Sequence, residues 1–178
     1  MRVVAMTMMA GVLCLPAAIG LAQEMPAKSA ASCAAMDKTL SPDLAAWTAQ
    51  TPLAAATSAA SLGKAALTPG KAVTADLPQT PQVRFVTQPE KPGGAVSHGG
   101  MFELKIDKAG TYVVALGSGA WIDVLKDGKP LVSTAHSHGP DCSTLRKMVD
   151  FPLEPGRYVL QVSANADAKL PILLARRP

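Results

Sequence analysis

From residue 71 to the C-terminus, short extended segments alternate with turn residues, and this pattern limits the possible folds more than any other feature. In the segment 101–107, apolar residues at 102, 104 and 106 alternate with charged residues at 103, 105 and 107, as in a half-buried strand. Asp127-Gly128 is a strong two-residue hairpin signal. Nine strands are predicted, at 72–77, 83–87, 101–107, 111–116, 120–126, 130–136, 147–153, 156–162 and 170–175.

Helix signals are few. Ser41 can cap a helix, Pro42 suits its first position, and Asp43 faces its positive end, so a short helix is expected near 42–47. Leu44 and Trp47 would dock it on the domain. The alanine-rich residues that follow, up to the turn before the first predicted strand, give no firm signal. We therefore predict an all-β fold, an antiparallel β-sandwich or jelly roll of about nine strands with a short N-terminal helix; a closed barrel is the alternative.

The chain also contains a weak internal repeat. In 102–114 and again in 151–160, a strand with Phe-x-Leu turns at a glycine into a strand that carries tyrosine two residues later. Two equivalent hairpins, one in each facing sheet, would account for this similarity.

The N-terminus has the features of a secretory signal peptide. Arg2 precedes an apolar run from 3 to 21, which ends in small residues before Gln23. Cleavage after Ala22 is predicted, with a membrane anchor as the alternative. The expected organisation is a signal peptide at 1–22, an N-terminal extension at 23–39 and a β-sandwich domain at 40–178. The mature protein would then be periplasmic or secreted, with no stable membrane span.

Charge excludes one class of partner. The formal net charge of +4 is spread along the chain without a block of one sign, whereas nucleic-acid binding normally needs a basic stripe. We expect no nucleic acid as partner. A metal ion, a small molecule or another protein of the cell envelope is expected instead.

The cysteines support an oxidising location. Cys14 leaves with the signal peptide, so the mature chain keeps Cys33 and Cys142. A disulfide between them is the default expectation, and it would tie the N-terminal segment beside a histidine loop. In the competing interpretation, Cys142 stays a thiolate ligand next to His136 and His138.

All three histidines lie in two Ser-His-Gly turns. His136 and His138, spaced i, i+2 at the end of a predicted strand, would point to the same face, and His98 precedes another strand. Three imidazoles can fill three positions of a tetrahedral zinc site, or bind copper, and leave the fourth position open. Asp141 or Glu103 would be the acidic member.

Other residue sets have weaker chemical signals. Ser97, Ser137 and Asp141 can be combined with the histidines into a Ser-His-Asp arrangement, but no Gly-x-Ser-x-Gly elbow surrounds either serine. Trp121 and Asp123 share one strand face, which is either a sugar-stacking surface or part of the core. The three charged residues of 146–150 are expected to form surface cross-strand pairs.

Three segments, 97–100 (SHGG), 119–124 (GAWIDV) and 142–151 (CSTLRKMVDF), resemble a family of small exported bacterial proteins. The resemblance covers roughly 33–178, and members of this family often carry the label homogentisate 1,2-dioxygenase. The dioxygenase of that name resembles a cupin with iron held by two histidines and a carboxylate.

Within this chain, His136-x-His138-x-x-Asp141 is similar to the first cupin motif. After Pro155-Gly156, Tyr158 stands where the second motif has histidine, so His98 would have to supply the missing ligand.

Three functions follow from these observations. The leading expectation is a non-enzymatic, exported β-sandwich that binds copper, zinc or a small ligand through its histidines. The second is a small non-haem iron dioxygenase with His98, His136, His138 and Asp141 as ligands. The third is a structural or interaction module of the cell envelope.

Overall fold

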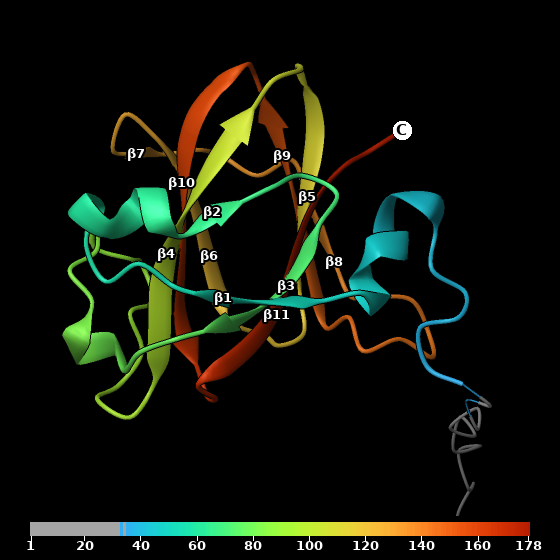
Figure 1. Ribbon diagram of the computed structural model, residues 1–178, viewed down its shortest axis with the longest axis horizontal. Helices are drawn as coiled ribbons and strands as arrows, with labels where there is room; N and C mark the ends of the chain where they lie inside the picture. The colour runs from blue at the N-terminus through green and yellow to red at the C-terminus, as the bar shows by residue number, and fades with distance from the viewer. Residues whose placement is uncertain (1–32, 34) are drawn as a thin grey trace, which may run out of the picture. The chain divides into compact units, whose positions relative to one another are not determined.

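The computed structural model describes Cys33 and residues 35–178, and this part is built around two stacked β-sheets (Figure 1). The predicted signal peptide and most of the N-terminal extension lie outside the described residues. No helix in the described part is long and apolar enough to cross a membrane. The predicted all-β sandwich is confirmed.

The two sheets hold eleven strands, two more than predicted. The six-stranded sheet has the order β1 (Thr51–Ala54), β3 (Ala72–Asp76), β11 (Lys169–Arg176), β5 (Gly110–Leu116), β9 (Lys147–Leu153), β8 (Ala135–Ser137). The five-stranded sheet has the order β2 (Ala66–Leu67), β4 (His98–Ile106), β10 (Gly156–Asn165), β6 (Trp121–Lys126), β7 (Lys129–Pro130). The pairs β1–β3 and β2–β4 are parallel and the others antiparallel, so both sheets are mixed.

The core lies between the inner faces of the two sheets. The predicted alternation of β4 is correct, because Phe102, Leu104 and Ile106 are all buried there. Burying such aliphatic and aromatic side chains contributes roughly 1.5–3 kcal/mol each. Fully buried members from the other strands include Leu116, Leu153, Leu160, Leu170 and Ile172.

The expected helix forms as a 3-10 helix, η1 (Pro42–Thr48), and covers the outer face of the six-stranded sheet. Leu44 and Trp47 are buried there, and the indole Nε1 of Trp47 donates a hydrogen bond to Thr144 Oγ1 at 2.8 Å. Two shorter 3-10 helices, η2 (Ala59–Lys64) and η3 (Thr80–Gln82), lie further along the chain.

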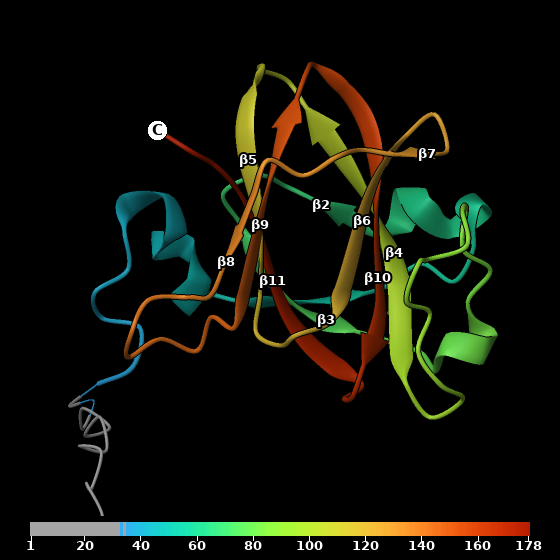
Figure 2. The same ribbon diagram turned by 180° about the vertical axis from the view of Figure 1, so that it is seen from behind.

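Two predicted strands are wrong. Residues 83–87 are not a strand, because the amides of Val86 and Thr87 bond to the side chain of Gln161 instead of to a neighbouring strand. Residues 130–136 are split between β7 and β8, because the chain crosses here from one sheet to the other (Figure 2). The strands β1 and β2 were not predicted, since short alanine-rich segments have no clear pattern of their own.

The internal repeat is real, but it does not mark hairpins. In both copies the chain passes between the sheets, from β4 to β5 and from β9 to β10. The hydroxyl of Tyr112 donates to Lys108 O at 2.9 Å, and that of Tyr158 donates to Glu154 O at 2.8 Å. These are two equivalent arches, each closed by a tyrosine that bonds four residues upstream.

Both arches turn at a glycine. Gly110 has φ 157° and Gly156 has φ 152°, values that residues with a Cβ rarely adopt. In each copy, the turn requires the glycine for its backbone conformation and the tyrosine for the hydrogen bond that closes the arch.

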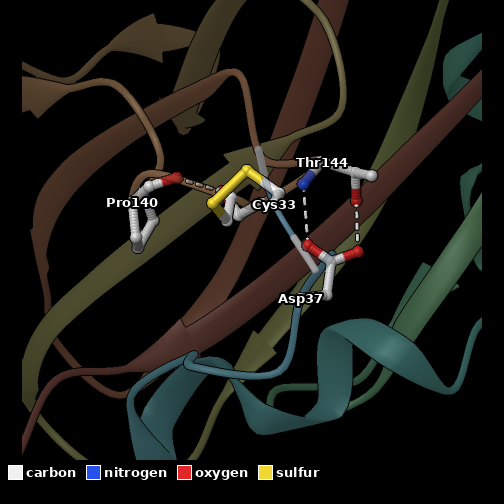
Figure 3. The surroundings of a disulfide bond; sticks show 6 residues. Cys33, Asp37, Pro140 and Thr144 are labelled. Atoms are coloured by element: carbon white, nitrogen blue, oxygen red, sulfur yellow. Dashed lines mark hydrogen bonds between the residues drawn. A yellow bond between two sulfur atoms is a disulfide. The ribbon is translucent and has the colours of Figure 1, made fainter. Parts of the chain in front are cut away.

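The predicted disulfide joins Cys33 to Cys142 (Figure 3). Beside it, the carboxylate of Asp37 accepts hydrogen bonds from the amide and the hydroxyl of Thr144, each at 2.7 Å. The amide of Asp37 donates to Cys142 O at 2.9 Å. The disulfide and these hydrogen bonds fasten the segment before η1 to the loop between β8 and β9, and Cys142 is not a thiolate ligand.

We predict that Tyr158→Phe lowers the free energy of unfolding by about 1–2 kcal/mol, because the lost hydroxyl also accepts the amide of Glu154 at 3.0 Å. Tyr112→Phe loses only one hydrogen bond, so it should lower the free energy of unfolding by a smaller amount. Urea unfolding of the two variants checks this, and an unchanged Tyr158→Phe protein would show that the arch does not depend on its tyrosine.

The double variant Cys33→Ser/Cys142→Ser should lower the free energy of unfolding by about 2–4 kcal/mol, since the bond links residues 109 apart in sequence. Asp37→Ala, which leaves the disulfide in place, is the matched control and should lower the free energy of unfolding by a smaller amount. Thermal and urea unfolding under non-reducing conditions give the comparison. Equal stability of the double variant and the unaltered protein contradicts the prediction.

Candidate functional site

A cavity of about 470 Å³ lies where the β6 edge of one sheet meets the β8–β9 edge of the other, and we call it the edge cavity. Its apolar wall comes from both sheets and from the crossing segment, and charged or polar groups surround it. The lining residues are Glu90, Trp121, Ile122, Asp123, Pro130, Leu131, Val132, Ser133, His136, Lys147, Val149 and Phe151.

The cavity exists because β7 covers only part of the β6 edge. Lys126 pairs with Lys129, and Val124 O accepts a hydrogen bond from the amide of Leu131 at 2.8 Å. After Leu131 the chain leaves β6, and Thr134 already bonds to Asp150 in the other sheet. The next stretch of the β6 edge therefore has no strand beside it among the described residues.

Lys147 connects the two sheets at one end of this opening. It projects from β9, and its ammonium donates a hydrogen bond to Ala120 O at 2.8 Å, just before β6. The same Nζ lies 5.4 Å from the centre of the Trp121 ring. Burial lowers the pKa of Lys147 below its ordinary value, and the positive charge of Lys91 lowers it further.

A second lysine reaches the same ring from a segment that crosses the outer face of the five-stranded sheet. This segment, 86–91, is held by two buried side chains of β10. Gln161 accepts from two of its amides and donates to Thr87 O at 2.9 Å, and Ser163 donates to Lys91 O at 2.8 Å. As a result, Lys91 Nζ lies 4.7 Å from the Trp121 ring centre, within cation–π range.

Carboxylates complete the surroundings of Trp121. Asp123 Oδ1 accepts a hydrogen bond from the indole Nε1 at 3.0 Å. Burial raises the pKa of Asp123; the indole hydrogen bond opposes this shift, and the negative charge of Glu90 adds to it. Trp121 and Asp123 are thus candidate functional residues. Their position on one strand face follows from the sequence alternation.

These charges are not neutralised by one another. Within the described residues, the ion pairs join other groups, and none includes Glu90, Lys91, Asp123 or Lys147. Asp123 and Lys147 are partly buried, whereas Glu90 and Lys91 are exposed. The charges of Asp123 and Lys147 therefore interact more strongly with an incoming ligand, because water screens them less.

His136 and His138 lie close together, as their spacing predicts. His136 pairs with Val149 of β9 and lines the edge cavity. Both imidazoles also line a second hollow of about 340 Å³, together with Arg146 and Lys147. The His138 ring Nδ1 lies 3.1 Å from Arg146 O, and because a carbonyl only accepts, Nδ1 is the donor.

The remaining predicted ligands lie elsewhere. His98 begins β4, with Nδ1 3.2 Å from Ala166 O, and β10 separates β4 from β6. Asp141 is exposed in the loop after β8, and Glu103 pairs with Arg157 at 3.3 Å. Among the described residues, no group of three or more His, Cys, Asp or Glu side chains is arranged to hold a metal ion.

Sequence reasoning missed the two lysines at Trp121. The sequence predicts Lys147 in a surface pair, but the residue lies on the same, inner face of β9 as buried Val149. The alternation of 147–153 contained this signal. Lys91 lies in an irregular segment, and no local pattern indicates that it reaches Trp121.

We predict that Asp123→Asn raises stability relative to the unaltered protein at pH values above the unfolded pKa of 3.8, because asparagine still accepts the indole hydrogen bond without a partly buried charge. Since the folded pKa of Asp123 lies above the unfolded value of 3.8, ionisation costs the native state stability as the pH rises through the folded pKa. Urea unfolding between pH 3.5 and 7 measures the difference, with exposed Asp127→Asn as control. A difference that is constant across this range contradicts the prediction.

The sequence matches no protein-family model and no curated protein. The family resemblance of the three segments therefore stays a prediction.

Proposed function

We propose that this protein is an exported, non-enzymatic binding protein that takes a small organic ligand into the edge cavity, with His136 on the cavity wall. The observation that carries the proposal is the Trp121 ring, which has two lysine ammonium groups beside it and an apolar wall next to it. The volume of about 470 Å³ lies in the range of small-molecule sites.

The ligand combines an apolar body with an anionic group. Lys91 and Lys147 repel each other and have no carboxylate partner in the described part of the chain, so an anion between them removes an unfavourable interaction. Ile122, Val149 and Phe151 offer an apolar surface to the rest of the molecule.

A small ligand has more support than a metal ion. Copper, zinc or iron would have to bind His136 and His138 next to the cationic Arg146 and Lys147, while His98 lies on β4. An anionic molecule gains from the same positive charges. Export is supported by the disulfide, because such bonds persist mainly in oxidising compartments.

Titration with 2-naphthoate, an aromatic carboxylate, tests the proposal. We expect a saturable shift of the Trp121 indole N–H resonance, while the resonance of buried Trp47 stays in place; the Trp47→Phe variant assigns the two signals. Lys147→Met should weaken binding about tenfold, the loss expected for one charge-assisted hydrogen bond.

Lys126→Met is the matched control. Lys126 lies 4.7 Å from the Tyr158 ring centre, so this variant also removes a lysine from an aromatic ring, but outside the edge cavity. Its affinity should equal that of the unaltered protein. If neither naphthoate nor a panel of aliphatic carboxylates moves the Trp121 resonance, the proposed function is wrong.

A further inference from the structure

One backbone position in the edge cavity is open for strand pairing. In β6, the N–H and C=O groups of even-numbered residues face away from β10, as the hydrogen bond from the Leu131 amide to Val124 O shows. On this edge Lys126 is paired with β7, Val124 O is bonded, and Ala120 O is bonded to Lys147. Ile122 lies between these satisfied positions, and no strand lies opposite it in the described part of the chain.

From this edge we propose that the ligand of the cavity is the C-terminal end of an extended peptide, which pairs with Ile122 as a short antiparallel strand. The inference rests on the proposed function and names its ligand class. The N–H and C=O groups of one residue in an extended peptide point to the same side, so they can bond to the C=O and N–H groups of Ile122.

The register sets the direction of the peptide. An antiparallel partner of β6 runs from the Val124 side toward the Ala120 side. Leu131 occupies the position opposite Val124, so the bound strand is short at that end. Its chain end lies toward Ala120, where the Lys147 ammonium is placed to meet a terminal carboxylate.

The same register determines which side chain enters the cavity. In an antiparallel pair, directly opposed residues project to the same face of the sheet. Ile122 belongs to the inner face, so the peptide residue opposite it points toward Val149 and Phe151, which line the cavity. An apolar residue is therefore expected there, followed by the C-terminal residue on the Trp121 side.

Three synthetic dipeptides test the inference. The free acid acetyl-Val-Ala is titrated into the full-length protein and compared with its C-terminal amide and with the free acid carrying an N-methyl group on valine. We expect the free acid to shift the Ile122 amide and Trp121 indole resonances, and each modified peptide to bind about tenfold more weakly or worse. Lys147→Met should remove the preference for acid over amide, whereas Lys126→Met keeps it.

Naphthoate distinguishes failure of the peptide inference from failure of the proposed function. If naphthoate binds the cavity but the free-acid dipeptide does not, or if all three peptides bind equally, the peptide inference is overturned and the proposed function stands. If naphthoate, the aliphatic carboxylates and the three peptides all leave the Trp121 resonance in place, both are overturned. Binding of the free acid without a shift at Ile122 also overturns strand pairing.

Discussion

Burial of one face of each sheet against the other holds this structure together. Most of the large apolar side chains lie in this one core, which draws on both sheets. To contribute to both faces, the chain must pass repeatedly from sheet to sheet. The arches closed by Tyr112 and Tyr158 are two of these passages, and the segment between β7 and β8 is a third.

The candidate site is a consequence of the third passage. When the chain leaves β6 after Leu131, it cannot also cover the remainder of that edge, and the inner apolar wall becomes accessible from the side. Lys147 closes part of the opening by donating to Ala120 O across the two sheets. The Lys147 ammonium on this edge disfavours pairing with arbitrary strands. A ligand with a carboxylate and one residue that pairs with Ile122 fits the same edge.

The charged groups near the edge cavity also depend on contacts distant in sequence. Lys91 is placed over Trp121 because Gln161 and Ser163, buried in β10, bind the backbone of its segment. Such buried polar side chains are costly unless satisfied, and here all their bonds go to one irregular segment. Part of this arrangement could be predicted, since the faces shared by Trp121 with Asp123 and by His136 with His138 follow from local periodicity.

The sequence by itself determined the all-β class, most of the long strands, the Asp127-Gly128 hairpin and the disulfide, because alternation, turn chemistry and cysteine number act over a few residues or need no partner. Only the tertiary structure decided which sheet each strand joins, where 130–136 divides, and that His98 lies on β4, away from the His136 pair. It also decided the open position at Ile122. These features depend on packing and hydrogen bonding between segments far apart in the chain, for which a local pattern has no signal.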